Sequence, residues 1–182
     1  MSMRKYATLT RDIEVSEIPA GTRGSIPSGT PITIVQALGG SFTAMTMQGY
    51  MVRIEGKDAD AIGEEPPPAP PAAESASGKS TLDLAWDQLR TCFDPEIPVN
   101  IVDLGLVYEC MLAPRDEGGQ KATVRFTLTA PGCGMGDFLR QDVIGKLMSV
   151  PGIDQVDAEV VFDPQWNQSM MSDAARLQLG MM

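Results

Sequence analysis

Histidine is absent from this sequence of 182 residues, and its absence removes several kinds of chemistry. A Ser-His-Asp triad, a Cys-His pair and a zinc site with histidine ligands cannot be built from this sequence. Any general base therefore has to be an aspartate, a glutamate, a lysine, a tyrosine or a thiolate.

Cysteine is scarce, with three residues and no CxxC spacing. An odd number of widely spaced cysteines is not typical of a disulfide framework. We therefore expect Cys92, Cys110 and Cys133 to be free thiols in a reducing compartment.

Basic residues and long apolar runs are also in short supply. Lysine and arginine number 14 against 24 aspartates and glutamates, which gives a formal net charge of −10. A chain this acidic, without a basic cluster, is a poor partner for nucleic acid or an anionic membrane surface. The N-terminus lacks the apolar core of a signal peptide, and no apolar run approaches the length of a membrane span. We expect a soluble, cytoplasmic protein.

One stretch divides the chain by composition. Residues 63–79, GEEPPPAPPAAESASGK, hold five of the 14 prolines beside alanine, serine and glutamate. Such a stretch cannot pack a core and favours an extended linker. The predicted domains are a small β-rich module (1–62), this linker (63–79), an α/β domain (80–163) and a tail (164–182) that contains Trp166 and a Met-rich end.

The part before the linker has the alternation of short strands. Ile13 and Val15 alternate with polar residues, TPITIVQAL is rich in β-branched residues, and Val52 and Ile54 alternate near a turn at Gly49. We expect a small all-β meander or partial barrel. Its core is thin, so we expect it to dock on the second half of the chain or on a partner.

The part after the linker predicts a two-layer α/β (α+β) domain. Ser80 and Asp83 form a capping-box pattern at the start of a helix over residues 81–92. Alternation predicts strands over 104–112, 121–129 and 154–163, and helical spacing predicts a second helix between about 135 and 150. The order is α-β-β-α-β, with helices on one face of a three-stranded sheet.

Cys133 is the cysteine with the most unusual surroundings. It lies among Gly132, Gly134 and Gly136, between a predicted strand and the start of a predicted helix. Free N–H groups at a helix N-terminus stabilise a thiolate, so a reactive or metal-ligating cysteine is one interpretation. A small residue that completes a tight turn is the other, and the spacing alone does not decide between them. A nucleotide-binding loop is disfavoured because the full G-x-G-x-x-G spacing is missing.

A second candidate site is the stretch DPEIPVNIVDLGLVYE, residues 94–109. Asp94, Glu96 and Asp103 either cap turns and face solvent or supply hydrogen bonds or a carboxylate ligand to the Cys133 turn. Around Gly105 we expect an irregular strand entry where another backbone segment approaches closely.

The positions of three further residues predict their surroundings. Cys110 is in phase with the apolar side of its strand, so we expect a buried structural cysteine, and Cys92 is expected to be partly buried. Trp166 either caps the edge of the core or anchors a partner. The last residues, MSDAARLQLGMM, are expected to form a short helix.

The acidic stretch and the Cys133 turn together resemble a known family. DPEIPVNIVDLGLVYE followed by FTLTAPGCGM is similar to the metal–sulfur cluster biosynthesis family, which includes the targeting factor of cytosolic iron–sulfur assembly, and the flanking segments resemble its long bacterial form. The resemblance implies an iron–sulfur assembly-type domain, a role in maturing iron–sulfur proteins without catalysis, and Cys133 as the functional thiol. That Cys133 also ligates metal is a hypothesis. The supporting motif that carries over consists of Asp94, Pro95, Glu96, Asp103, Gly105, Thr129, Pro131 and Gly132.

The implied cargo is an iron–sulfur cluster, and the implied partners are the assembly machinery and client apo-proteins. A cluster normally takes four ligands, so it would be shared by two Cys133 thiolates in a homodimer with added thiols, or with a client's cysteines. A client-targeting adaptor that holds no cluster fits equally well. The alternative is a persulfide carrier or redox protein with Cys133 as nucleophile. A KH-like nucleic-acid module is disfavoured by the negative charge.

Overall fold

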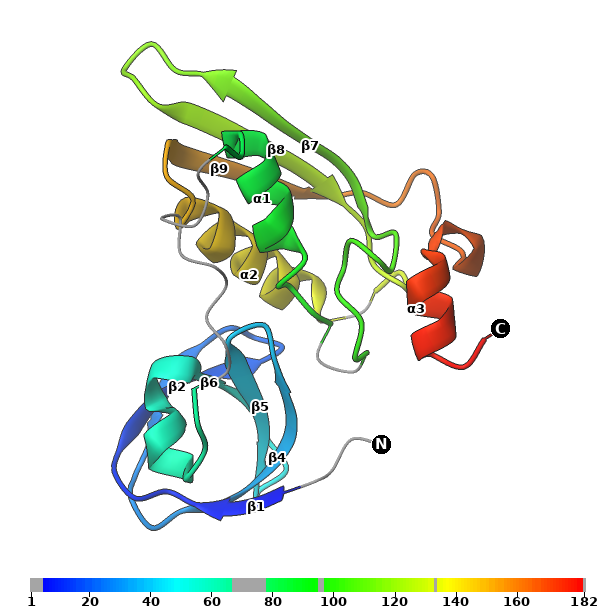
Figure 1. The fold of residues 1–182 in the computed structure, drawn as a ribbon. Coiled ribbons are helices and arrows are strands. Elements are labelled where there is room, and N and C mark those ends of the chain that lie inside the picture. Colours follow the sequence, from blue (N-terminus) through cyan, green and yellow to red (C-terminus); the bar gives the residue numbers. More distant parts are fainter. Residues whose placement is uncertain (1–4, 67–77, 95–96, 133, 182) are drawn as a thin grey trace. The chain divides into compact units, whose positions relative to one another are not determined.

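The computed structural model describes residues 5–66, 78–94, 97–132 and 134–181. The chain divides into two compact units, residues 1–70 and 71–182, and both are drawn in Figure 1. Most of the predicted linker, residues 67–77, lies outside the described residues. The boundaries of the four proposed domains therefore remain a proposal.

The first unit is a six-stranded antiparallel sheet. Its strands run in the order β1-β4-β5-β6-β2-β3. The strands are β1 (Lys5–Thr8), β2 (Ile13–Ile18), β3 (Arg23–Ile26), β4 (Pro31–Leu38), β5 (Ser41–Thr46) and β6 (Met51–Glu55). The expected all-β module is confirmed, and β4, β5 and β6 form its meander. The β1–β4 and β2–β6 pairings join segments that are far apart in sequence.

Alternation explains the core of this unit. The inward residues of β2, β4 and β6 are apolar and buried, and the 3-10 helix η1 (Gly56–Ile62) adds buried alanines and Ile62. Arg11, before β2, binds η1 by donating hydrogen bonds to Asp58 and Asp60. The pKa of the Asp60 carboxyl is lowered by these bonds.

The second unit has the predicted α-β-β-α-β order. It contains α1 (Thr81–Leu89), β7 (Val107–Pro114), β8 (Gln120–Phe126), α2 (Gly136–Met148) and β9 (Ile153–Val160). The sheet order is β7-β8-β9, with β7 and β8 antiparallel and β8 and β9 parallel. Figure 1 shows α1 and α2 on the same face of this sheet. A 3-10 turn, η3 (Gln168–Met170), and a short helix, α3 (Asp173–Gln178), follow.

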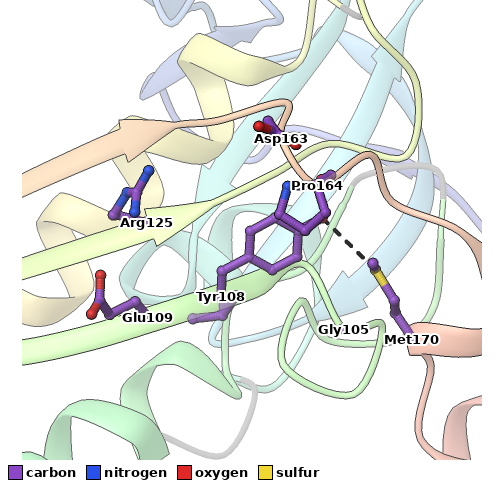
Figure 2. Close-up of a pocket in the computed structure, with 8 residues that line it drawn as sticks. Gly105, Tyr108, Glu109, Arg125, Asp163, Pro164 and Met170 are labelled. Atoms are coloured by element: carbon purple, nitrogen blue, oxygen red, sulfur yellow. Dashed lines mark hydrogen bonds between the residues drawn. The ribbon is translucent and has the colours of Figure 1, made fainter.

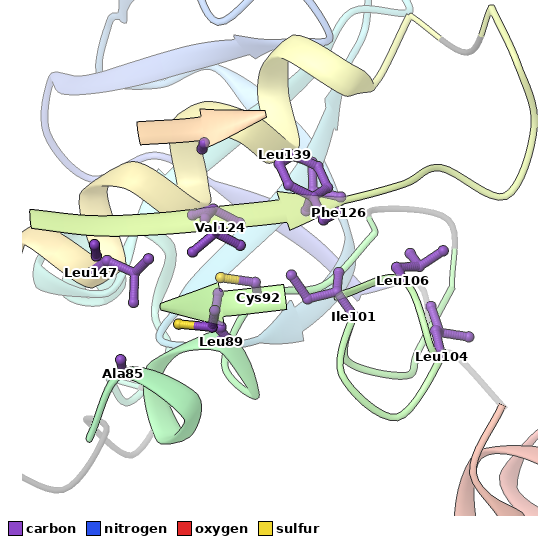
Figure 3. Close-up of a cluster of buried hydrophobic side chains, with 14 of the residues drawn as sticks. Ala85, Leu89, Cys92, Ile101, Leu104, Leu106, Val124, Phe126, Leu139 and Leu147 are labelled. Carbon is purple, nitrogen blue, oxygen red and sulfur yellow. The ribbon is translucent and has the colours of Figure 1, made fainter. Parts of the chain in front are cut away.

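The core of the second unit lies between the sheet and the two helices, as Figure 3 shows. Every second residue of β8 points into it, so that Ala122, Val124 and Phe126 are fully buried, and Leu139 and Leu147 cover them from α2. The C-terminal segment also contributes, because Met171 and Ala175 belong to the same buried cluster. The side of β8 predicted from its alternation is the buried one, whereas Leu82 in α1 and Phe162 after β9 are exposed although the apolar spacing includes them.

Several predicted boundaries differ from the observed ones, and β9 ends at Val160 rather than residue 163. The helix α1 ends at Leu89 rather than residue 92, because the N–H groups of Thr91 and Cys92 bond to carbonyls three residues back and tighten the chain into a turn. The strand β7 begins at Val107 rather than residue 104, because Gly105, at φ +72°, ends a turn. The strand β8 ends at Phe126 rather than residue 129.

Candidate functional site

The acidic stretch and the Cys133 turn adjoin the same end of the β7–β8 pair. Val107, the first residue of β7, is opposite Phe126, the last residue of β8. The acidic stretch therefore enters the sheet where the turn that leads to Cys133 departs. The N–H of Thr127 donates to the carbonyl of Leu106 (2.8 Å), so the two segments are hydrogen-bonded to each other.

The acidic stretch begins as a loop whose two ends are joined by backbone pairing. Phe93 pairs with Asn100 in an isolated bridge, and the N–H of Ile101 donates to the carbonyl of Cys92 (3.0 Å). Asp94 is the first loop residue after this pairing, and only 6% of its surface is exposed. It is thus a buried carboxylate. Pro95 and Glu96 lie outside the described residues.

Asp103 holds the second half of this loop. Asn100 Oδ1 accepts from the N–H groups of Val102 (3.0 Å) and Asp103 (2.9 Å), and Asn100 Nδ2 donates to the Asp103 carboxylate (2.6 Å). These bonds form an Asx turn, the local structure that asparagine side chains favour. Asp103 is therefore half-buried and engaged in shaping the loop.

Gly105 lies where another backbone segment crosses the loop, as the sequence predicts. A Cβ atom on this residue would lie 2.1 Å from the carbonyl oxygen of Met170, and the backbone has a positive φ. Both features require glycine. Asp103 and Gly105 thus lie in one turn, covered by the C-terminal segment.

The Cys133 turn is described on both sides of the cysteine. Thr129 is half-buried, and Pro131 and Gly132 are exposed, with Gly132 at φ +75°. After the turn, α2 begins without a capping hydrogen bond from the side chain of its N-cap residue, Met135. Cys133 itself lies outside the described residues.

Thr127 carries a hydroxyl that sequence reasoning missed. The residue is 1% exposed, and its Oγ1 has no hydrogen-bond partner in the part of the chain that is described. A buried unpaired hydroxyl usually costs about 1 to 3 kcal/mol. It is next to the last residue of β8, six residues before Cys133, and no alternation pattern marks it.

The other two cysteines are part of the core. Cys110 is 8% exposed in β7, and burial raises the pKa of its thiol to about 11. Cys92 is fully buried beside α1, where its Sγ lies 3.8 Å from the carbonyl of Gln88. The structural role expected for Cys110 is confirmed, and Cys92 is more deeply buried than expected. Among the described residues, no group of three or more His, Cys, Asp or Glu side chains could hold a metal ion.

An open pocket of about 620 Å³ lies beside the loop. Figure 2 shows Tyr108 among the lining residues, with Pro164 and Met170 near the end of its side chain. The Tyr108 hydroxyl donates to the carbonyl of Pro164 (2.7 Å) and lies 3.8 Å from the Met170 sulfur. The lining is Gly105, Val107, Tyr108, Glu109, Arg125, Asp163, Pro164 and Met170. Of the predicted site residues, Gly105 lines this pocket. Its walls join Tyr108 to Pro164 and Met170, which are 56 and 62 residues further along the chain, so sequence spacing gives no signal for it.

Trp166 is placed by the same C-terminal segment. Its ring is half-buried against the core, and its Nε1 donates to the carbonyl of Leu104 (2.8 Å). The interpretation of Trp166 as a cap over the edge of the core is thus confirmed. The predicted short helix in this segment is α3. None of the helices in the described part of the chain is both long and apolar enough to span a membrane.

Comparison with known proteins matches the second unit. The family model described as iron-sulfur cluster assembly protein matches residues 84–160. A Porphyromonas gingivalis protein named Fe-S protein maturation auxiliary factor is 48% identical over 93 residues, 50% of this chain and 84% of that protein. The Staphylococcus aureus protein named Fe-S protein maturation auxiliary factor SufT is 40% identical over 87 residues, 48% of this chain and 94% of that protein.

A solved structure is also similar to this chain. It is a domain of unknown function, DUF59, from Bacillus anthracis, with 30% identity and a TM-score of 0.49. The match covers 59% of this chain and 99% of that structure.

Proposed function

This chain belongs to the SufT-like iron–sulfur cluster assembly proteins, and from that premise we propose that it matures iron–sulfur proteins through Cys133. One observation carries the proposal beyond the family: the acidic loop and the Cys133 turn leave the same end of the β7–β8 pair and are hydrogen-bonded there. Both relatives named above are maturation auxiliary factors, which supports a role without catalysis and disfavours a thiol enzyme.

A cluster, if carried, is cargo that this chain alone does not fully ligate. Iron–sulfur clusters take about four thiolate ligands, and the chain has three cysteines. Two of these, Cys92 and Cys110, are buried in the core. Cys133 would then share the cluster with added thiols, with a second copy of the chain or with a client's cysteines. Incomplete ligation favours release over storage.

The loop supplies the surroundings of the cysteine in this proposal. Thiolates are favoured beside the N–H groups of a helix N-terminus, and α2 begins three residues after Cys133. In this proposal the acidic loop contributes its carboxylates, Asp94 and Glu96 first. They would orient the approach of iron or of a client through hydrogen bonds.

Anaerobic reconstitution with ferrous iron, sulfide and a small thiol tests the carrier form. We expect a charge-transfer absorption band in the wild type and in Cys110→Ala, the matched control that removes a buried thiol. The band should be lost in Cys133→Ser. A band of equal strength in Cys133→Ser contradicts ligation by Cys133. No iron uptake by any of the three proteins overturns the carrier form and favours the client-targeting adaptor.

A further inference from the structure

The C-terminal segment crosses the acidic loop outside the region that the family model matches. Five side-chain or backbone hydrogen bonds join residues 164–178 to residues 98–108. They run from Gln178 to the carbonyl of Pro98 (2.6 Å), from Ser172 N–H to the carbonyl of Asp103 (2.8 Å), from Ser172 Oγ to the Asp103 carboxylate (3.3 Å), from Trp166 to the carbonyl of Leu104 (2.8 Å) and from Tyr108 to the carbonyl of Pro164 (2.7 Å).

The segment is anchored independently of these bonds. Met171 and Ala175 are buried in the main core, and the Trp166 ring packs on its edge. Its first residue after β9, Val161, donates its N–H to the carbonyl of Phe126 (2.8 Å). A segment held by the core at both ends can fix the position of what it crosses.

The loop is therefore held from two sides. The C-terminal segment binds it at Asp103 and Leu104, and the lead-in to the Cys133 turn binds it at Leu106 through Thr127. Between these points lies Gly105, which has no room for a side chain against Met170. A displacement of the C-terminal segment would therefore move Leu104 and Gly105. These residues lie two and one positions before Leu106, which is bonded to the lead-in of the Cys133 turn.

We infer that the C-terminal segment, residues 161–178, is a positioning element of the site. Through Trp166 and Ser172 it fixes the part of the acidic loop that is hydrogen-bonded to the lead-in of the Cys133 turn. The inference deepens the proposed function, and rests on it for the importance of Cys133. Trp166 and Ser172 are positioning residues, since they act through the loop.

Two serines in this unit make a matched pair of variants. Ser172 caps α3 by accepting from the N–H of Ala175 (3.1 Å), and Ser80 caps α1 by accepting from the N–H of Asp83 (3.2 Å). Both lose a cap on replacement by alanine. Only Ser172 also holds Asp103. A difference between Ser172→Ala and Ser80→Ala therefore reports on the loop rather than on a lost cap.

The test is the rate at which iodoacetamide alkylates Cys133 in the folded full-length chain, measured across pH. The Cys133 thiolate forms an S–C bond, iodide leaves, and the thiol proton goes to solvent. Burial protects Cys92 and Cys110, and peptide mass spectrometry assigns the modified thiol. We expect Ser172→Ala and Trp166→Phe to change the rate at neutral pH at least about threefold, with a shifted pH profile. Ser80→Ala should match the wild type, and Ser172→Thr should restore it.

Equal rates and pH profiles in Ser172→Ala, Trp166→Phe and Ser80→Ala overturn the inference. Circular dichroism shows whether each variant is folded, and Trp166→Phe keeps an aromatic ring in the core, so loss of folding does not decide the result. The readout needs no iron–sulfur activity. A failure of the maturation role, seen with Cys133→Ala in cells, is thus distinguishable from a failure of the positioning role.

Discussion

Gly105 is the residue on which the acidic loop and the C-terminal segment depend most directly. Alanine there would have a strained backbone at φ +72° and a Cβ in contact with the Met170 carbonyl. Gly118, in the β7–β8 hairpin, has φ +91° and open space around it. The two glycines thus separate backbone strain from a steric clash.

We predict that Gly118→Ala costs about 1 to 2 kcal/mol of unfolding free energy from strain alone. Gly105→Ala should cost roughly 1 to 3 kcal/mol more, because the clash displaces the C-terminal segment as well. Chemical denaturation followed by tryptophan fluorescence measures both, since Trp86 and Trp166 lie in the second unit. Equal losses in the two variants would show that the Met170 backbone does not constrain Gly105.

Cys110 gives the second unit a pH dependence in the alkaline range. Its thiol pKa is raised to about 11 by burial, so the folded chain keeps this proton when the unfolded chain has released it. The contribution is fully present below the thiol's ordinary pKa and is lost as the pH rises toward 11. The predicted loss is on the order of 2 kcal/mol.

Comparison with Cys110→Ala isolates this effect, because the two chains differ in this one ionisable side chain. The unfolding free energy of the wild type should fall more steeply than that of the variant between about pH 9 and 11. Parallel curves would contradict the assignment of the raised pKa to Cys110.

The Thr127 hydroxyl predicts an unusual substitution. Replacement of a buried, unpaired hydroxyl by a methyl group of the same shape removes a desolvation cost, so Thr127→Val should be neutral or more stable by up to about 2 kcal/mol. Thermal unfolding measures this. A clear loss of stability would mean that the hydroxyl is paired in solution, and the alkylation rate of Cys133 in this variant would then show whether the pairing serves the site.

At the scale of elements, the start of α1 is the part most firmly specified by local sequence. Ser80 and Asp83 form the capping box predicted from their spacing, with both reciprocal hydrogen bonds present. These bonds also lower the pKa of Asp83. Ser80→Ala should lower the unfolding free energy of the second unit by about 1 kcal/mol, and Ser80→Thr by less. No change in Ser80→Ala by fluorescence-detected denaturation would mean that the cap does not contribute.

Elements with strong periodicity were predictable, and contacts between distant segments were not. The alternation of β8 and the spacing of α2 identify their buried faces, because one side of each element must be apolar. The strands β1 and β3 escaped prediction because they are four residues long and largely exposed. Hydrogen bonds from Trp166 to Leu104 and from Gln178 to Pro98 span 62 and 80 residues, and no local pattern encodes them.

The boundary of β7 illustrates a conflict between two local signals. Leu104 and Leu106 continue the apolar alternation and predict a strand from residue 104. The positive φ of Gly105 and the Asx turn at Asn100 prevail, so pairing with β8 begins at Val107. Both leucines are still fully buried, as cover for the core rather than as strand residues.

At the scale of the whole molecule, the chain has two units and one family match. The match to iron–sulfur cluster assembly proteins lies within the second unit, and the β-rich first unit lies outside it. The whole chain has a formal net charge of −10, so the acidic loop belongs to an acidic protein. The proposed functional thiol, Cys133, is one of the matched residues.

The most direct test replaces the chromosomal copy with Cys133→Ala and measures the activity of iron–sulfur enzymes under iron limitation. The matched control is Cys110→Ala, which removes a buried thiol away from the Cys133 turn. We predict a several-fold loss of iron–sulfur enzyme activity in cells with Cys133→Ala, at equal protein abundance, and near wild-type activity with Cys110→Ala. Full activity of those enzymes in the Cys133→Ala cells would contradict the claim that this protein acts in maturation through Cys133.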